Sequence, residues 1–232
     1  MGLRRYRDRR DFRRTPEPRG RAASRHRRPL RYAVQKHDAR RLHHDLRLEL
    51  DGVLKSWAVP RTPPLRPGDK VLAVQTEDHP IDYAGFEGVI PKGQYGGGTV
   101  MLWDRGTWEA DGDARADLER GKLTFRVEGE RLRGRWSLVK MRPRERDGRE
   151  RRSTGREWLL IKRSDDEPRA LGWEQPERSV ASGRTMEEIA EEADRVWMSE
   201  GEGESESESE SESELRQSLT KAARARGRAR RR

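Results

Sequence analysis

Residues 42–50 carry polar side chains at alternate positions, and the chemistry of these side chains is unusual for a surface strand. The polar positions are His43, Asp45, Arg47 and Glu49, and every intervening residue except His44 is leucine. Successive side chains of a β-strand point to opposite faces, so one face buries leucines while the other gathers an imidazole, a guanidinium and two carboxylates. Such a face can bind a cation together with the anionic phosphate that accompanies it.

Two histidines and one carboxylate are the candidate metal ligands. His43 and Asp45 lie two residues apart on one face of the expected strand, and His37 stands at the end of the preceding strand. A His₂Asp set can hold a divalent metal, with Zn²⁺ or Co²⁺ among the acceptable ions, and leave positions open for water and a phosphate oxygen. The alternative is that these residues are hydrogen-bonded parts of a β-barrel. His44 lies on the leucine face, so we do not expect it to be a ligand.

Other polar residues could act on a phosphate beside such a metal. Arg47 suits bidentate phosphate binding, although it could instead form an ion pair with Glu49 or with a neighbouring strand. His79 could bind phosphate or act as the general acid for a leaving oxygen, and Tyr83 could donate a hydrogen bond to the same oxygen. The long loop 76–98 is glycine-rich and could cradle a phosphate, but it lacks the Gly-Lys-Ser/Thr of a P-loop NTPase.

Residues 36–41 offer a competing interpretation. They read Lys-His-Asp-Ala-Arg-Arg, which resembles the nucleotidyltransferase signature Lys-x-Asp-Gly-x-Arg except that Ala39 replaces the glycine. In that case Lys36 would accept AMP covalently. The chain is short for a ligase core and has no convincing later ligase motif, so we do not favour this alternative.

Composition limits the classes of protein to consider. The 232 residues include no cysteine, which excludes disulfides, zinc–thiolate sites and thiol nucleophiles and suits a reducing cytoplasm. No apolar run approaches the roughly 20 residues that span a bilayer, so we expect no membrane contact. The net charge of +10 is concentrated in residues 1–41 and 215–232. Basic ends on a nearly neutral body indicate a nucleic-acid partner and a cytoplasmic, nucleoid-associated location, although arginine enrichment can also reflect a GC-rich genome.

Alternating short segments and frequent turn residues predict a mainly β fold. The expected strands are 30–36, 42–50, 53–59, 70–75, 99–103, 107–110, 122–127, 131–141 and 157–163. Asp51-Gly52 is a strong hairpin signal, and we expect another turn at 104–106. Short helices are expected at 113–120 and at 184–198, the second capped by Thr185. Together these elements predict a compact antiparallel β-barrel with long active-site loops and one or two short helices.

Composition also divides the chain into four parts. Residues 1–29 form a basic arm, ordered or semi-ordered but not a packed element, and 30–170 form the barrel domain. Residues 171–199 are a linker with a helix. Residues 200–232, an acidic Ser-Glu repeat followed by a basic Arg-rich tail, have little apolar content and should be disordered.

A set of short motifs spread over residues 8–170 matches one known family. The matching segments are Arg10-Asp11-Phe12, 15–18, 35–38, 42–49, 56–60, 77–80, 86–88, 90–91, 95–96, 103–104, 106–108 and 158–162. Together they resemble the 3′-phosphoesterase domain of bacterial ligase D, and the combination is highly specific.

The resemblance implies a Mn²⁺-dependent β-barrel enzyme that trims the 3′ ends of DNA for repair by end joining. Such domains remove a 3′-terminal ribonucleoside to leave a 3′-phosphate, and then remove the phosphate to leave a 3′-OH. By position, the implied metal ligands are His37, His43 and Asp45. The other implied site residues are Arg47, His79, Tyr83 and Arg61 around the scissile phosphate, Arg10, Asp11 and Glu17 from the N-terminal arm, and, more weakly, Glu77.

The chain departs from the family pattern at two positions, because Val71 stands where an arginine is expected and Thr62 replaces a common glycine. Polymerase and ligase modules are absent from these residues, so we expect a stand-alone, monomeric version. Its expected partners are DNA or RNA–DNA 3′ ends, together with a separate ligase, a polymerase and Ku end-binding proteins. The alternative function is a non-catalytic DNA-end-binding accessory that recruits a ligase or polymerase.

Overall fold

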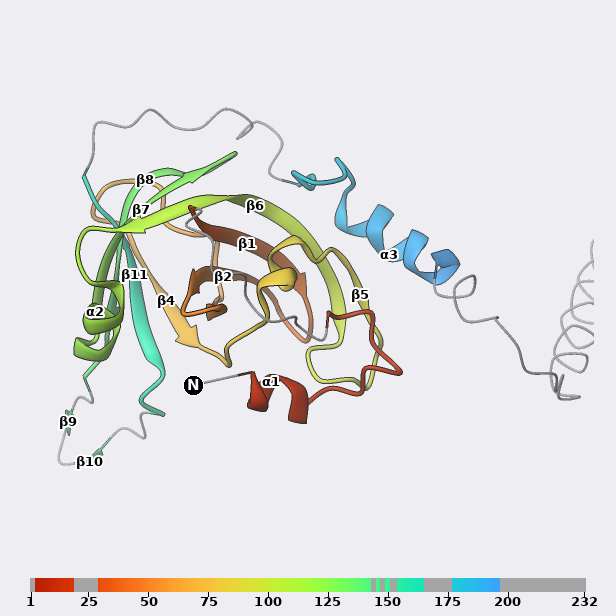
Figure 1. The fold of residues 1–232 in the computed structure, drawn as a ribbon, viewed down its shortest axis with the longest axis horizontal. Coiled ribbons are helices and arrows are strands. Elements are labelled where there is room, and N and C mark those ends of the chain that lie inside the picture. The colour runs from red at the N-terminus through yellow and green to blue at the C-terminus, as the bar shows by residue number, and fades with distance from the viewer. Residues whose placement is uncertain are drawn as a thin grey trace, which may run out of the picture. The chain divides into compact units, whose positions relative to one another are not determined.

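The described part of the protein is built around one closed β-sheet (Figure 1). The computed structural model describes residues 3–18, 29–142, 145–146, 149–150, 154–164 and 177–196. Eight antiparallel strands form a barrel, because β1 and β6, the first and last of these eight in pairing order, also pair with each other. In pairing order they are β1 (Leu30–Asp38), β2 (Leu42–Leu50), β3 (Val53–Val59), β4 (Lys70–Gln75), β11 (Glu157–Lys162), β8 (Arg133–Lys140), β7 (Lys122–Gly129) and β6 (Gly98–Ala110). The expected antiparallel β-barrel is confirmed.

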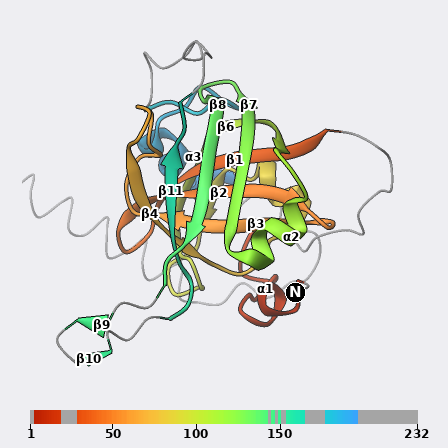
Figure 2. The ribbon, with the colours of Figure 1, turned by 90° about the vertical axis from the view of Figure 1, so that its left-hand side faces the viewer.

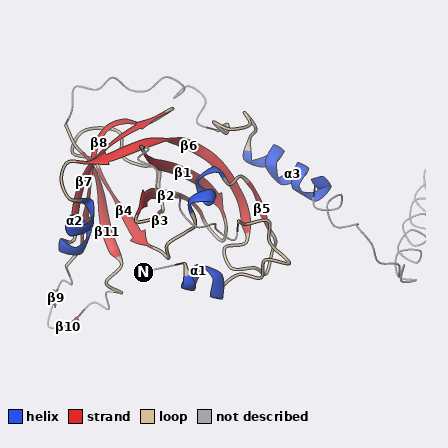
Figure 3. Ribbon diagram, viewed as in Figure 1, coloured by secondary structure: helices blue, strands red, loops and turns tan. Residues whose placement is uncertain are grey.

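Few helices accompany these strands (Figure 3). The helical elements are α1 (Arg4–Asp8), the 3-10 helix η1 (Ile81–Gly85), α2 (Ala114–Arg120) and α3 (Met186–Val196). Strand β5 (Gly88–Ile90) extends the sheet beside β6, while β9 (Glu145–Arg146) and β10 (Arg149–Glu150) pair only with each other. Within the described ranges, no helix is long and apolar enough to cross a membrane.

The chain reverses between β2 and β3 at Asp51-Gly52, as the sequence predicts. Their φ angles are +54° and +77°, the left-handed pair that a type I′ hairpin turn requires. This turn fixes the register, and directly opposed residues share one face of the sheet. The opposed polar residues on this face are His37 and His43, Gln35 and Asp45, and Arg47 and Ser56.

The opposite face of the same strands packs into the main apolar cluster of the barrel. Leu46 and Leu48 of β2 belong to this cluster and are at most 3% exposed. The cluster also holds the five tryptophans of the described part, which are Trp57, Trp103, Trp108, Trp136 and Trp158. Figure 2 shows β7, β8 and β11, which close the barrel on one side. The leucine face predicted from the alternation is therefore the core face.

A second apolar cluster lies on the polar side of β1–β3. Tyr6 of α1 and Tyr83 of η1 belong to it together with Ala33 and Leu54, and Phe12 packs against it. The expectation that residues 1–29 are not a packed element is wrong for residues 3–18, because aromatic residues placed among the arginines anchor the segment. Residues 19–28 lie outside the described part.

Strand β6 runs without interruption through residues 104–106, so the turn expected there is wrong. The irregularity in this region is a β-bulge in the pairing with β1, where Val34 faces Asp104 but Gln35 faces Leu102. A bulge adds one residue to one strand and bends it without ending the pairing. The polar and glycine residues at 104–106 therefore serve a purpose other than chain reversal.

Asp104 is fully buried and organises the turn between β7 and β8. Its carboxylate accepts hydrogen bonds from the Tyr32 hydroxyl at 2.6 Å and from the backbone N–H groups of Arg131 and Leu132, each at 2.8 Å. Burial raises the pKa of Asp104, although these hydrogen bonds act in the opposite direction. Gly129 leaves the necessary space, because a Cβ there would lie 2.6 Å from Asp104 Oδ2.

Several other sequence predictions differ in detail from the structure. Strand β1 continues to Asp38, so His37 lies within the strand and not at its end. The segment 76–98 includes η1 and β5, and 142–156 includes β9 and β10. The Thr185 cap is confirmed: its hydroxyl accepts the Glu188 N–H at 3.2 Å, and the Glu188 carboxylate accepts the Thr185 N–H at 2.8 Å.

The described part of the expected linker 171–199 packs on the barrel. Ile189 of α3 is 2% exposed and belongs to the main apolar cluster, and the Val180 N–H donates to the Leu102 carbonyl at 2.9 Å. Residues 165–176 and 197–232, which include the Ser-Glu repeat and the Arg-rich tail, lie outside the described residues. The disorder expected for 200–232 therefore stays a prediction.

Replacing Asp104 with alanine should strongly destabilise the barrel. The substitution removes the carboxylate that accepts from the buried Tyr32 hydroxyl and from three backbone N–H groups, at a cost of about 3–5 kcal/mol in the free energy of unfolding. Urea unfolding measures the change. The matched control is Asp111→Ala, which removes an exposed carboxylate 3.4 Å from Arg135 and should cost about 1 kcal/mol or less. Equal destabilisation by the two substitutions would contradict this account.

Candidate metal centre

Three side chains of β1 and β2 direct their donor atoms toward one another. One ligand atom from each of His37, His43 and Asp45 lies within 4.8 Å of the others. Asp45 is central, with Oδ2 at 3.6 Å from His37 Nδ1 and Oδ1 at 3.7 Å from His43 Nε2. His37 and Asp45 are buried, whereas His43 is partly exposed. The structure thus brings together the three candidate ligands of the sequence.

Backbone carbonyl groups fix the proton positions on both imidazoles. Nε2 of His37 lies 2.9 Å from the Gly96 oxygen, and Nδ1 of His43 lies 2.9 Å from the Arg41 oxygen. A carbonyl oxygen can only accept, so these ring nitrogens carry the protons and donate. The remaining nitrogens, Nδ1 of His37 and Nε2 of His43, face Asp45 and are the ones available to a metal ion. An outer N–H bonded to a carbonyl is the usual way in which a protein orients a metal-binding histidine.

Arg47 maintains the negative charge of Asp45. Its Nη2 donates to Asp45 Oδ2 at 3.1 Å, and both side chains are buried. Burial alone would raise the pKa of Asp45, but Arg47 and the adjacent imidazoles hold the pKa well below its usual range. The carboxylate is consequently ionised wherever the protein is folded near neutral pH.

The rest of the Arg47 guanidinium joins three strands to η1. Nε donates to Gln35 of β1 at 2.5 Å, Nη1 donates to Ser56 of β3 at 2.9 Å, and the Tyr83 ring lies 4.7 Å from Cζ. Gln35 in turn donates to the backbone oxygens of Tyr83 and Phe86, at 3.0 and 2.8 Å. The hydrogen bonds of Arg47 to Gln35, Ser56 and Asp45 use three of the five N–H groups that a guanidinium carries, and two are left for a ligand.

The N-terminal segment supplies a second buried guanidinium, that of Arg10. It donates to Glu17 at 2.7 Å and to Glu77 at 3.3 Å, and it lies 3.3 Å from His79 Nε2. Its Cζ also lies 3.9 Å from the centre of the Tyr6 ring. The sequence-predicted residues Arg10, Glu17, Glu77 and His79 therefore form one cluster beside the triad's strands.

His79 is neutral in this cluster. Its Nδ1 donates to the Glu77 carbonyl at 2.9 Å, so Nε2 carries the lone pair that accepts from Arg10. Burial lowers the pKa of His79 well below its usual range, and Arg47 and Arg10 lower it further. In this conformation Nε2 has no proton to give, which does not match the general-acid role expected from the sequence.

Aromatic rings enclose His79. Tyr6 and Tyr83 contact it edge to face, with centroid separations of 5.1 and 4.9 Å. Burial raises the pKa of Tyr83 well above its usual range, and the nearby Glu17 carboxylate raises it further. Tyr83 therefore keeps its hydroxyl proton at neutral pH and can donate a hydrogen bond.

Three other candidates lie outside this network of contacts. Asp11 is exposed, and its carboxylate accepts the Arg13 N–H at 3.0 Å. Arg61 is exposed and follows β3, whose register places that end of the strand beside the His43 end of β2. Glu49 lies at the far end of β2, where it accepts the Arg31 N–H at 3.0 Å, so Arg47 pairs with Asp45 and not with Glu49.

The opposite strand face holds His44 and Lys36. The His44 ring packs edge to face against Trp103 at 5.3 Å, and burial together with the Lys36 charge lowers the pKa of His44 to about 4. Lys36 forms an ion pair with Glu177. Because neighbouring residues of a strand point to opposite faces, the lysine of the nucleotidyltransferase-like motif is separated from the triad.

The glycine loop contributes a carbonyl group to the site. Gly98 allows this loop to approach β1, because its φ is +147° and a Cβ there would lie 2.1 Å from the Asp38 oxygen. That approach brings the Gly96 oxygen to His37. The preceding residue, Tyr95, accepts a hydrogen bond from Arg9 at 2.7 Å. The glycines thus position the candidate ligand His37, and the phosphate cradle expected of this loop stays a prediction.

Sequence reasoning missed several residues of the site. Gln35 and Ser56 position Arg47, while Tyr6 and Tyr95 support the Arg9–Arg10 segment. Gln35 could have been found, since it stands two residues before His37 on the same strand face. Nothing in the spacing of Tyr6 or Tyr95 predicts their contacts with the arginines.

The donor set of this face fits a divalent metal. His37, His43 and Asp45 offer two imidazole lone pairs and one carboxylate, a mixture that suits Mn²⁺, Co²⁺ or Zn²⁺. Three protein ligands leave coordination positions for water and a phosphate oxygen.

Comparison with known proteins identifies the family. Residues 35–140 match the DNA Ligase D 3′-phosphoesterase domain, and this range contains the entire triad and Arg47. The chain belongs to this family. Val71, where the family resemblance leads us to expect arginine, packs against the main apolar cluster in this 3′-phosphoesterase domain.

Three relatives illustrate the extent of the similarity. The Multifunctional non-homologous end joining protein LigD of Pseudomonas aeruginosa is 51% identical over 187 residues, which cover 78% of this chain and 21% of that protein. The Multifunctional non-homologous end joining DNA repair protein LigD of Mycobacterium tuberculosis is 44% identical over 138 residues, or 60% of this chain and 18% of that protein. The LigD protein of Mycolicibacterium smegmatis is 35% identical over 202 residues, or 84% of this chain and 24% of that protein. The chain spans about a fifth of the length of these relatives.

Two adjacent histidines provide a matched test of the candidate metal centre. His43→Ala removes a ligand from the polar face and should lower the affinity for Mn²⁺ by roughly 100-fold or more. His44→Ala removes a ring from the core face and should keep the wild-type affinity. Isothermal titration calorimetry on both variants, with folding checked by circular dichroism, measures the difference. The proposed ligand set would be wrong if neither variant lost affinity for Mn²⁺, or if both lost it equally.

Proposed function

We propose that the protein is a Mn²⁺-dependent 3′-end-processing phosphoesterase, with 3′-ribonuclease and 3′-phosphatase activities, that leaves DNA ends with a 3′-OH for repair by end joining. The observation that carries this proposal is the triad itself, in which two imidazole nitrogens and an ionised carboxylate converge beside a buried guanidinium. Membership of the DNA Ligase D 3′-phosphoesterase family supports the reaction class.

His37, His43 and Asp45 would hold the metal. When bound, a divalent ion polarises a phosphoryl oxygen and lowers the pKa of a coordinated water molecule. Backbone carbonyl groups keep the two imidazoles in the correct tautomers for this task, and Arg47 keeps Asp45 ionised.

The arginines would stabilise the charge that develops on the phosphoryl oxygens. Arg47 retains two N–H groups beyond those used by Gln35, Ser56 and Asp45. Because these groups are already oriented in a buried site, they cost little reorganisation when the transition state forms. We assign the principal electrostatic role to Arg47.

His79 and Tyr83 would act in different ways. Neutral His79 accepts from Arg10 and so positions that guanidinium, while Tyr83 retains its hydroxyl proton as a donor for an oxygen of the substrate. Glu17 and Glu77 would hold Arg10 in place. Asp11 and Arg61, both exposed, would contact the nucleic acid outside the buried cluster.

The proposed substrates are DNA or RNA–DNA 3′ ends, and the proposed setting is the bacterial cytoplasm in association with the nucleoid. The names of the relatives in Pseudomonas aeruginosa and Mycobacterium tuberculosis place those proteins in non-homologous end joining. A ligase, a polymerase and Ku end-binding proteins are the partners that such a role requires.

Turnover of defined 3′ ends tests the proposal. With Mn²⁺, the protein should process a DNA primer that ends in one ribonucleotide and a primer that ends in a 3′-phosphate, and a chelator should abolish both reactions. Asp45→Asn removes the charged ligand, and the rate should fall roughly 100-fold or more.

Asp69→Asn is the matched control, because it makes the same chemical change at an exposed residue just before β4 and should keep the wild-type rate. If the folded, metal-loaded protein binds these primers and converts neither one, the catalytic proposal fails and the DNA-end-binding accessory role takes its place.

A further inference from the structure

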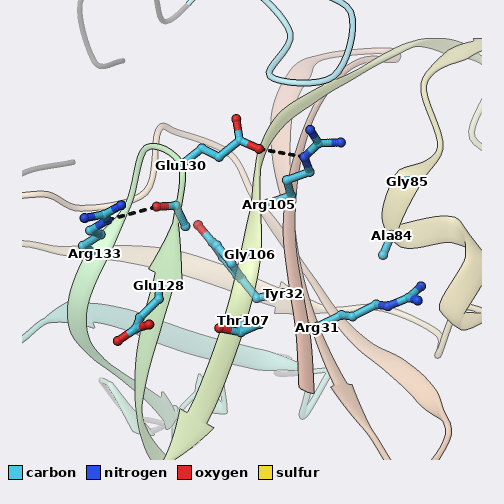
Figure 4. Close-up of a pocket in the computed structure, with 11 residues that line it drawn as sticks. Arg31, Tyr32, Ala84, Gly85, Arg105, Gly106, Thr107, Glu128, Glu130 and Arg133 are labelled. Carbon is cyan, nitrogen blue, oxygen red and sulfur yellow. Dashed lines mark hydrogen bonds and ion pairs between the residues drawn. The ribbon is translucent and has the colours of Figure 1, made fainter. Parts of the chain in front are cut away.

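A pocket of about 540 Å³ lies beside η1, at the level of the turn between β7 and β8 (Figure 4). Ala84 and Gly85 of η1 form one wall. The polar residues that line it are Arg31, Arg105, Thr107, Glu128, Glu130 and Arg133. None of the triad residues lines this pocket, so it is separate from the metal centre.

The pocket and the metal centre share one face of β1. Arg31 stands six residues before His37, and an even separation places both side chains on the same side of the strand. At a rise of about 3.3 Å per residue, the two positions lie roughly 20 Å apart. A stacked nucleic-acid strand advances about 3.4 Å per nucleotide, so roughly six nucleotides span this distance.

The cations of the pocket are accessible, in contrast to those of the metal centre. Arg10 and Arg47 have side chains that are at most 4% exposed, and they are held by internal hydrogen bonds. Arg31, Arg105 and Arg133 are all exposed. Long-range attraction to a polyanion and the release of its counterions depend on accessible charges of this kind.

Arg31 is the most available of these cations. Among the residues that the structure describes, its guanidinium has no ion-pair or hydrogen-bond partner, while its backbone N–H is fixed by Glu49. Register places Arg31 opposite Thr107 and Ala33 opposite Arg105. Arg31 and Arg105 are therefore diagonal neighbours, a separation of about 7–8 Å that long side chains bridge, and Figure 4 shows both beside η1.

The three arginines of the pocket outnumber its two carboxylates, and one of these, Glu130, pairs with Arg105. Arg105 Nε donates to Glu130 at 2.8 Å in an ion pair that is about half exposed on each side, and Arg133 Nε donates to the Gly129 oxygen at 3.3 Å (Figure 4). Each of these guanidinium groups keeps further N–H groups for a phosphate, since it carries five in total.

We propose that this pocket is a second nucleic-acid site, which binds a backbone phosphodiester roughly six nucleotides from the 3′ end held at the metal centre. Arg31 and Arg105 are the primary phosphate ligands, with Arg133 and the Thr107 hydroxyl at its margin. The assignment rests on the proposed function for its substrate. A phosphate contact at the pocket would add affinity and fix the position of the strand, because Arg10 and Arg47 at the metal centre are already hydrogen-bonded within the protein.

Charge reversal at paired positions tests the proposal. The pocket variant is Arg31→Glu with Arg133→Glu, and the matched control is Arg115→Glu with Arg120→Glu on α2, which precedes the opposite end of β7. Both variants change the net charge equally. Fluorescence anisotropy with a 20-base-pair deoxyribonucleotide duplex, without metal, measures binding independently of turnover.

The pocket variant should bind this duplex roughly tenfold more weakly at 0.1 M NaCl, and the slope of log K against log salt should decrease by about 2 relative to the control. On the ribonucleotide-ended primer with Mn²⁺, KM should rise while kcat stays at the wild-type value. Equal affinities and salt slopes for the two variants would overturn the pocket assignment. Absence of turnover in the wild-type protein would instead contradict the proposed function. The comparison of duplex binding by the two variants would still show whether the pocket binds nucleic acid.

Discussion

The buried guanidinium of Arg47 is the constraint on which the rest of the polar face depends. Taking a guanidinium out of water costs several kcal/mol, and only a complete set of partners offsets this. Gln35, Ser56, Asp45 and the Tyr83 ring supply that set from β1, β3, β2 and η1. The same contacts that satisfy Arg47 therefore align the strands, dock η1 and keep the central carboxylate of the triad ionised.

Two layers with opposite chemistry follow from this arrangement. The leucine and tryptophan side of β1–β3 stabilises the barrel, while the other side holds charges that the N-terminal segment and η1 shield from water. Burial keeps His79 neutral and maintains the lone pair that receives Arg10. The arginines of the pocket are exposed and make fewer contacts within the protein than Arg10 and Arg47 do, so the proposed attraction of a nucleic acid and the proposed chemistry at its end rest on different residues.

The sequence predicted those elements that are determined by residues close together in the chain. Alternation in 42–50 identified the polar face, Asp51-Gly52 identified the hairpin, and Thr185 identified the start of a helix. Long-range contacts could not be predicted in this way. From the sequence alone Asp104 resembles a turn residue, and only the folded β7–β8 turn shows what it binds. Tyr6 likewise resembles part of a basic arm, and only the fold shows its contacts with Arg10 and His79.

The central claim is that backbone carbonyl groups prepare the two ligand histidines before any metal binds. Long-range ¹H–¹⁵N correlation NMR on the metal-free protein tests this directly, since only five histidines contribute signals. The account predicts that Nε2 of His37 and Nδ1 of His43 carry protons donated to the Gly96 and Arg41 carbonyl groups, and that added Zn²⁺ perturbs Nδ1 of His37 and Nε2 of His43. Mixed tautomers on both rings, or a Zn²⁺ response at His44 or His79 in place of these nitrogens, would contradict it.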